Sequence, residues 1–319
     1  MILLHLFYMK NKLLIIRWAT ATGKTSLSLK IARNTVLLRD FAIDPKPVEI
    51  ISADSRQIYT HMNIGTDKIS QHIRNEIPHH QIDLIDPKQT YTAGQRKQDT
   101  ERIIEEIFAR GHQPIIAGGT WLYIDTLYKN FSMPEVAPDR AWRETMIKQE
   151  EVKKWFLYEE LVKLDPTEAM KHHPNSTRYL LRALEICYFT WSTKTELCKE
   201  NPVQWPIYML WLWREKEDTN KRINARIKEM MSDDALIQEN KKLLDMWYTL
   251  EHTAMNGIGY KEIVWYIQWE YDIEKAKELL RRHTHRYAKR QRSRFRRYIM
   301  DQKARPKENV EYEVRMLGE

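Results

Sequence analysis

The stretch IIRWATATGKTSLS, residues 15–28, decides the fold. An apolar run at 12–17 is typical of a buried strand, and the spacing predicts a helix over 24–33. Between them, GKT at 23–25 forms the second half of a phosphate-binding loop of the pattern G-x-x-x-x-G-K-[ST]. Trp18 stands where the first glycine of that pattern belongs. The stretch therefore predicts a phosphate site with one anomalous residue.

Strands and helices alternate after this loop. PVEIISAD (47–54) and QPIIAGGT (113–120) are typical of strands, and the segment 92–111 has helical spacing with a glycine at its end. Alternation of this kind favours an α/β fold, a P-loop-type parallel sheet flanked by helices. Ligands of such sheets bind beyond the carboxyl ends of the strands, where the loop, Asp54 and the GGT turn are expected to meet.

Composition changes toward charged, helical segments beyond residue 130. We expect a core built from 9–130 and 196–319, with a helical C-terminal region, and a helical insertion domain at 131–195. Met9 precedes the first strand, and we expect residues 1–8 to lie outside the natural protein.

The composition is that of a globular protein. Hydrophobic residues make up 42% and charged residues 30%, with no apolar run near the ~20 residues of a membrane helix. The net charge of +8 suits a polyanionic partner. Two cysteines, Cys187 and Cys198, provide neither a disulfide framework nor a zinc knuckle, so we expect a cytoplasmic protein.

Two polar groups follow predicted strands. Asp54 could bind magnesium through water or act as a general base, whereas an isolated aspartate is more often a helix cap. The turn GGT at 118–120 allows close backbone approach to a ligand, but alone it is a common turn. His79 and His80 are adjacent, so in a strand they point to opposite faces and are expected to be structural.

Basic residues recur at helical spacing. Arg178 with Arg182, and Arg222 with Arg226, each lie one turn apart, so each pair could be a solvated face or a diphosphate clamp. The stretch 281–297 is rich in lysine and arginine and contains no acidic residue. We expect this stretch to contact the backbone of a nucleic acid.

Taken in order, these segments resemble the tRNA dimethylallyltransferase (tRNA isopentenyltransferase) family from about Leu13 to Phe295. The matching segments are TATGKTSL, EIISADSRQIY, MNIGTDK, IPHHQIDLIDP, GHQPIIAGGTWLYI, LDPTEAMKHHPN, RALEI, NGIGYKE and RYAKRQRSRFRR. The resemblance implies transfer of a dimethylallyl group from its diphosphate to N6 of the adenosine 3′ of the tRNA anticodon (position 37), without ATP hydrolysis.

The resemblance also implies roles for particular residues. The catalytic residues would be Asp54 as general base with Thr120, Lys24 and Arg222. Mg²⁺ would be held by Thr25 and Asp54. The diphosphate would lie on Trp18, Ala19, Thr20, Ala21, Thr22, Gly23, Lys24, Thr25 and Arg226. The anticodon stem-loop of tRNA would contact Asp54, Ser55, Arg56, Gln57, Thr120, Arg143, Arg178, Arg182, Gly257, Gly259, Tyr260, Lys261, Lys289, Arg290, Gln291 and Arg294. We expect a monomer with no membrane partner.

Tryptophan replaces glycine at several family positions. The chain has 11 tryptophans and 9 glycines, and glycine alone usually makes up ~7% of a chain. The positions concerned are Trp18, Trp121, Trp191, Trp211, Trp247 and Trp269. Trp18 would place an indole where backbone must meet phosphate. Because some bacteria read UGA as glycine, we hypothesise that these codons are misread.

Other departures are Ala19 for proline, Tyr179 for arginine and Arg294 for tryptophan. Two other functions stay open at this point. One is a P-loop enzyme with a small substrate, either a kinase or an adenylate prenyltransferase. The other is a non-catalytic RNA-binding protein on a decayed P-loop scaffold, which a literal Trp18 favours.

Overall fold

The computed structural model describes residues 11–304 and 306–317. The expected start at Met9 and the segment 1–8 lie outside these residues. The chain divides into two compact units, a larger one comprising the chain up to Tyr128 together with Val203–Glu319, and a smaller one at Lys129–Pro202.

The larger unit is built on a six-stranded parallel sheet. Its strands are β1 (Leu13–Arg17), β2 (Val48–Ser52), β3 (His79–His80), β4 (Gln113–Gly118), β5 (Ile207–Trp213) and β6 (Val310–Met316). They follow the order β3-β2-β4-β1-β5-β6, and every neighbouring pair is parallel. The predicted α/β class is confirmed. Strands β5 and β6 were not predicted, because the region from 196 onward was expected to be helical, although the residues of β6 alternate between apolar and charged as in a strand.

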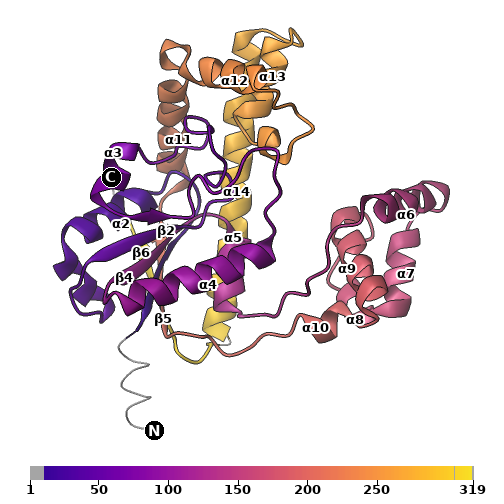
Figure 1. Cartoon of the computed structure of the whole chain (residues 1–319), viewed down its shortest axis with the longest axis horizontal. Helices are drawn as coiled ribbons and strands as arrows, with labels where there is room; N and C mark the ends of the chain where they lie inside the picture. Colours follow the sequence, from indigo (N-terminus) through magenta and orange to yellow (C-terminus); the bar gives the residue numbers. More distant parts are fainter. Residues whose placement is uncertain (1–10, 305, 318–319) are drawn as a thin grey trace. The chain divides into compact units, whose positions relative to one another are not determined.

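The larger unit also contains helices, some packed on the sheet and others beyond it (Figure 1). They are α2 (Lys24–Arg33), α3 (Gln71–Glu76), α4 (Ala93–Ala109), α5 (Trp121–Tyr128), α11 (Lys216–Met230), α12 (Ala235–Asp245), α13 (Tyr260–Ile267) and α14 (Ile273–Ala304), with short 3₁₀ turns at Thr35–Phe41, Ser232–Asp234 and Thr253–Asn256. In Figure 1, α11, α12 and α13 gather around the first part of α14. Apolar side chains of all four helices share one buried cluster there.

Local sequence explains where the central elements begin and end. Every residue of β1 is buried, as expected of an apolar central strand. Helix α4 begins with a capping box, in which Thr92 and Gln95 each satisfy the other's backbone N–H. Helix α2 begins directly after Gly23, whose φ of 95° is left-handed and favours glycine.

A buried carboxylate ties the amino ends of these strands together. Glu49, near the start of β2, accepts hydrogen bonds from both Nε and Nη2 of Arg110, and also pairs with His80 and His112. Burial alone raises the pKa of Glu49, but these three partners lower it to about 2. His79 and His80 therefore lie in a structural setting, since His79 also bonds the carbonyl of Ile77.

Replacing Glu49 with Gln is expected to destabilise the protein by about 1–2 kcal/mol, because it removes the anion from three partners. The folded pKa of Glu49 lies below its ordinary value of 4.5. Its stabilisation is therefore present above that value and is lost as pH falls toward 2. Denaturant unfolding at pH 7 and pH 3 checks this, and an equal loss for Glu49→Gln at both pH values would contradict it.

The smaller unit is helical. It contains α6 (Arg140–Val152), α7 (Phe156–Leu164), α8 (Pro166–Ala169), α9 (Thr177–Thr190) and α10 (Lys194–Leu197). Its core is formed by Leu157 and Leu161 of α7 with Leu180 and Leu184 of α9, all fully buried. Helix α8 begins at a proline and is capped by Asp165, which accepts from the backbone N–H of Glu168.

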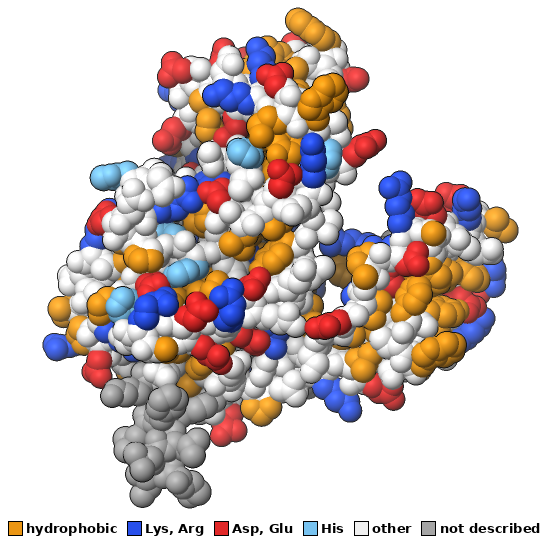
Figure 2. Space-filling model, viewed as in Figure 1, with side chains coloured by type: hydrophobic (Ala, Val, Ile, Leu, Met, Phe, Trp, Pro, Cys, Tyr) orange, Lys and Arg blue, Asp and Glu red, His pale blue; other side chains and the backbone are white. Residues whose placement is uncertain are grey.

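Within the described residues, no helix is both long and apolar enough to cross a bilayer. On the face shown in Figure 2, acidic, basic and hydrophobic side chains are interspersed. The positive excess of the chain is therefore not gathered into one continuous basic patch on this face.

Candidate active site

The phosphate loop is folded as a cradle between β1 and α2. Lys24 Nζ donates to the carbonyl oxygen of Ala19 at 2.6 Å, and the Thr22 hydroxyl donates to the same oxygen at 3.0 Å. Two arginines of α11 reach the loop from outside. Arg222 Nε donates to the Ala21 carbonyl at 2.9 Å, and Arg226 donates to the Thr20 hydroxyl at 3.0 Å. The predicted lysine and both predicted arginines therefore meet at one loop.

Burial and the nearby arginine lower the pKa of the lysine. Loss of water around Lys24, and then repulsion from Arg226, lower the pKa of the Lys24 ammonium to about 7. Arg226 also pairs with the carboxylate of Asp67 at 3.0 Å. Burial raises the pKa of Asp67, and attraction to Arg226 opposes that shift. An arriving anion would be stabilised by these cations and would favour the charged lysine.

The position of Trp18 differs from the expectation. Its side chain is fully buried, and its ring lies 5.0 Å from Trp213 and 5.4 Å from Phe295, measured between centroids. The indole therefore packs in the core and does not occupy the phosphate cradle. The indole N–H has no hydrogen-bond partner, and the same is true of buried Trp211.

Asp54 lies directly after β2, at the same edge of the sheet as the loop. Its Oδ1 accepts from the backbone N–H of Arg56 at 2.7 Å and, more weakly, from that of Gln57 at 3.4 Å. The hydroxyl of Thr120 accepts from the N–H of Ser55 at 3.1 Å. A Cβ on Gly118 would collide with the backbone of Ala53, so the GGT turn lets these two segments approach.

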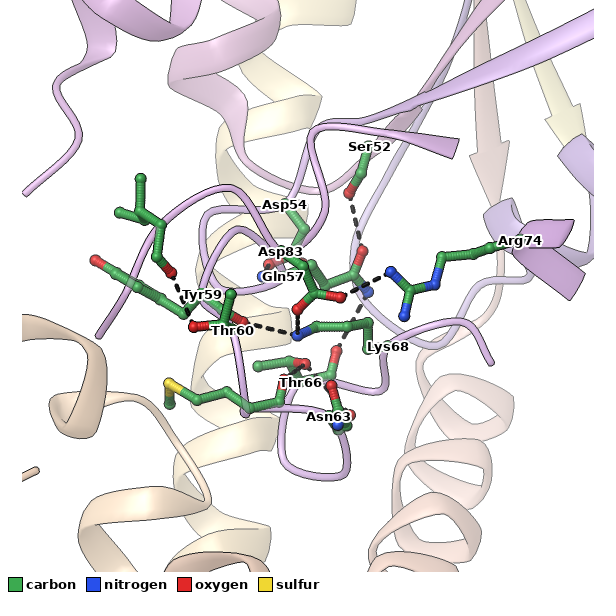
Figure 3. Close-up of polar contacts among 12 residues, drawn as sticks. Ser52, Asp54, Gln57, Tyr59, Thr60, Asn63, Thr66, Lys68, Arg74 and Asp83 are labelled. Carbon is green, nitrogen blue, oxygen red and sulfur yellow. Dashed lines mark hydrogen bonds and ion pairs between the residues drawn. The ribbon is translucent and has the colours of Figure 1, made fainter. Parts of the chain in front are cut away.

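The chain that follows Asp54 is held by an internal polar network (Figure 3). The amide of Gln57 accepts from the Ser52 hydroxyl at 2.9 Å and donates to the carbonyls of Thr66 and Asp67. Lys68 Nζ is buried and donates to the Tyr59 carbonyl and to Asp83. Gln57 is therefore bound within the protein while it stays half-buried, and its contact with tRNA stays a prediction.

Two other predicted tRNA contacts are buried. Tyr260 is 1% exposed, and its hydroxyl donates to Glu239 at 2.7 Å. Gln291 is 5% exposed and joins the Thr20 N–H to the Gly119 carbonyl, at 2.9 Å each. Both side chains support the site from inside, so we correct the expectation that they present a surface to RNA.

Among the other residues predicted to contact tRNA, Gly257 and Gly259 are also buried, whereas the basic residues of α14 are accessible. Lys289, Arg290 and Arg294 are exposed on α14, and Arg294 lies over the ring of Trp121 at 3.3 Å. Gly259, with φ of 99°, starts α13 beside Gly257 and Lys261. Arg56 donates to the Thr253 carbonyl at 2.7 Å.

Within the smaller unit, Arg143 and Arg182 converge on one carboxylate. Arg143 binds Glu185 through two nitrogens at 2.9 and 2.7 Å, and Arg182 binds it at 2.6 Å. Glu185 is fully buried, so it fixes both guanidinium groups in place. Arg178 on the same helix is exposed.

The donors predicted for Mg²⁺ fit that ion. Thr25 offers an exposed hydroxyl at the start of α2, and Asp54 has one carboxylate oxygen, Oδ2, outside the turn described above. Mg²⁺ prefers oxygen ligands and is held by few protein groups where a substrate supplies phosphate oxygens. The described residues contain no cluster of three or more His, Cys, Asp or Glu that could hold a metal.

Sequence reasoning did not find Asp67, Lys68 or Glu239. Asp67 and Lys68 lie within the quoted segment MNIGTDK, but nothing in their spacing marks them as contacts of Arg226 and Asp83. Glu239 is one charge among several in a helix, and the loop that it binds lies more than 170 positions earlier in the chain.

A family model described as IPP transferase matches residues 57–298. The chain belongs to the IPP transferase family. Among its relatives, the tRNA dimethylallyltransferase of Halothermothrix orenii is 41% identical over 291 residues, covering 90% of this chain and 85% of that protein. The tRNA dimethylallyltransferase of Alkaliphilus metalliredigens is 37% identical over 295 residues, covering 91% and 90%.

Solved structures of this family share the fold. The tRNA isopentenylpyrophosphate transferase of Bacillus halodurans is 31% identical, with a TM-score of 0.61 and coverage of 96% of this chain and 91% of that one. A eukaryotic dimethylallyltransferase described as acting on tRNA is 29% identical, with a TM-score of 0.67 and coverage of 88% and 69%.

Proposed function

We propose that this IPP transferase family member transfers a dimethylallyl group from dimethylallyl diphosphate to N6 of adenosine 37, 3′ of the anticodon, in tRNA. The observation that carries the proposal is the meeting of the Asp54 carboxylate and the phosphate loop at one edge of the sheet, with Arg222 and Arg226 bound to that loop. The names of the relatives support a dimethylallyl group as the group transferred and tRNA as the acceptor molecule. We propose that the chain acts as a monomer.

In the proposed reaction, N6 of the adenine attacks C1 of the dimethylallyl group, and the bond from C1 to the diphosphate oxygen breaks. The N6 proton passes to Asp54, whose Oδ1 is held by the Arg56 N–H and whose Oδ2 is the proposed proton acceptor. Negative charge grows on the departing diphosphate, and Lys24, Arg222 and the loop N–H groups stabilise it. The adenine must leave the anticodon stack to reach this site.

Thr25 and Asp54, the latter through water, would hold Mg²⁺. When bound, the ion neutralises charge on the diphosphate. Chelation with EDTA is expected to lower the transfer rate by about 100-fold or more. Titration with MgCl₂ should restore it, and full activity in EDTA would contradict the assignment.

Mass spectrometry of tRNA nucleosides tests the function. The protein is incubated with unmodified tRNA and dimethylallyl diphosphate, and isopentenyladenosine is expected at position 37. ATP with a small acceptor serves as the control for a kinase, and adenosine monophosphate serves as the control for an adenylate prenyltransferase. Binding of tRNA with no product in any arm would favour the non-catalytic RNA-binding protein.

A further inference from the structure

Glu239 of α12 binds a loop that leads to the site. Its side chain is nearly buried, at 9% exposure. Its carboxylate accepts from three consecutive backbone N–H groups, those of Asn63 and Ile64 at 2.8 Å and of Gly65 at 3.1 Å. Successive N–H groups of this kind form an anion site, and here the protein fills it with its own carboxylate.

Tyr260 of α13 completes this contact. Its hydroxyl donates to Glu239 at 2.7 Å, and burial raises the pKa of Tyr260, which keeps the hydroxyl protonated as a donor. A Cβ on Gly65 would lie 2.6 Å from the Tyr260 ring. The loop 63–65 is therefore packed against α12 and α13 without room for a side chain.

The same loop continues to the reaction centre. The carbonyls of Thr66 and Asp67 accept from the Gln57 amide, whose own carbonyl accepts from Ser52 (Figure 3). The Gln57 N–H in turn lies 3.4 Å from Asp54 Oδ1. The carboxylate of Asp67 pairs with Arg226 at 3.0 Å.

We propose that Glu239 is a positioning residue that fixes loop 63–67 and, through it, sets Asp54 and Arg226 relative to each other. The proposal rests on the proposed function for its kinetic readout. It predicts that helix α12, which supplies none of the predicted site residues, controls the rate of transfer rather than tRNA binding.

Glu239→Gln tests this, because the amide places an NH₂ group among N–H donors. We expect kcat to fall about 100-fold, as misplacement by about 1 Å can produce, with the KM for tRNA unchanged. Glu239→Asp should recover part of kcat. Tyr260→Phe removes one donor only and should give a smaller loss in a well-folded protein.

The matched control is Glu49→Gln, which alters another buried carboxylate. Glu49 lies near the start of β2, at the end of the strand away from Asp54. Glu49→Gln should lower stability but leave kcat unchanged. If Glu239→Gln lost as much stability as Glu49→Gln but kept the wild-type kcat, the proposal would be overturned. Hydrogen exchange gives a readout without activity, since amides 63–65 and 56–57 should exchange faster in Glu239→Gln. Wild-type exchange rates at these amides in Glu239→Gln would also overturn the proposal. If the wild-type protein had no transferase activity but the amides still exchanged faster in Glu239→Gln, only the proposed function would be contradicted.

A second inference rests on backbone conformation. Four tryptophans have left-handed φ values, namely 70° at Trp155, 56° at Trp191, 63° at Trp247 and 63° at Trp269. A bulky residue in this region is an outlier, because its Cβ crowds the following carbonyl. The other seven tryptophans have no such φ.

Two of these positions carry the helix ending that glycine usually provides. The N–H of Trp247 donates to Leu244 and that of the next residue to Leu243, and Trp269 closes α13 with the same two bonds. Gly111 ends α4 with the identical pair, its own N–H to Phe108 and the next N–H to Ile107. This is the Schellman motif, in which glycine is favoured at the left-handed position.

The indole side chains bury little surface at three of these positions. The side chains of Trp191, Trp247 and Trp269 are 91%, 81% and 90% exposed, so burial does not offset the backbone strain. Trp155, at the start of α7, is half-exposed and has the same conformation. The sequence patterns did not single out Trp155, and the backbone alone identifies it.

We infer that the protein made by its own cell carries glycine at 155, 191, 247 and 269. The codons at these four positions should be UGA, read there as glycine, whereas Trp142, Trp205, Trp213 and Trp265 should be encoded by UGG. Peptides from the native protein should show glycine at the four positions by mass spectrometry. UGG codons or tryptophan-containing peptides at these positions would overturn the inference.

Stability provides an independent check. The variant with glycine at all four positions should melt at a higher temperature than the chain with four tryptophans. The matched variant with alanine at the four positions should gain less, because alanine also has a Cβ. Equal melting temperatures for the glycine and alanine variants would contradict the conformational argument.

Discussion

Replacing Asp54 with Asn is expected to lower the rate of prenyl transfer by about 10³-fold, within the range that general bases contribute. Asparagine keeps the shape of the side chain, and its Oδ1 can still accept from the N–H of Arg56 and Gln57. The turn after β2 should therefore survive, and only the proton acceptor is lost. Single-turnover assays with radiolabelled dimethylallyl diphosphate measure the effect on the chemical step.

Binding of tRNA should be unchanged in Asp54→Asn, since the loss concerns the reaction and not the surface. Asp165→Asn is the matched control, because Asp165 also accepts backbone N–H bonds, from Glu168 and Thr195, but lies in the smaller unit. It should leave the chemical step unaffected. If Asp54→Asn retained most of the wild-type rate, the base would have to be another group.

Local patterns were sufficient to predict β1, β2, β4 and α2, but they did not predict β5, an interior strand of the sheet in a region expected to be helical. Helix α2 has the predicted bounds, and β1, β2 and β4 lie within their predicted segments, because apolar strands and a helix that begins after a left-handed glycine are specified by adjacent residues. Strand β5 is a continuous apolar run, which periodicity alone does not distinguish from a buried helical segment. Strand β6 does carry the alternation of a strand, but its pairing with β5, about 100 residues away, cannot be inferred from that pattern.

The sequence indicated which residues lie near the phosphate loop, but it did not indicate the direction in which the side chains point. The sequence indicated that Lys24, Arg222 and Arg226 serve one loop, and they do meet there. It could not indicate that Gln57 and Tyr260 point inward, because a polar residue in a motif is compatible with either a ligand contact or an internal brace. The direction depends on Glu239 and other partners far along the chain.

Trp18 illustrates the same limit. The pattern identified the position as a glycine site, but the burial of the ring depends on Trp213 and Phe295, which come from β5 and α14. A glycine there would leave the space now filled by the indole to be closed by these neighbours. Positions 191, 247 and 269 differ from position 18, because their side chains are exposed. At these positions only the left-handed backbone conformation indicates which residue is favoured.

Replacing Lys24 with Met is expected to lower the rate of transfer by about 10²–10³-fold, because the departing diphosphate loses a cation in a site with little water. Lys30→Met is the matched control, since Lys30 is exposed on the same helix. It should behave like the wild type. Equal losses in the two variants would point to general attraction of anions and not to a specific contact.

The lysine should also make substrate binding depend on pH. Since the pKa of Lys24 is lowered to about 7, the free enzyme loses this charge as pH rises above neutrality, while bound diphosphate favours the protonated form. The affinity for dimethylallyl diphosphate should therefore fall as pH rises from 7 to 9, by up to about tenfold per pH unit. Isothermal titration calorimetry across this range measures the slope. Lys24→Arg should flatten it, because a guanidinium stays charged, and an unchanged slope in that variant would assign the titration to another group.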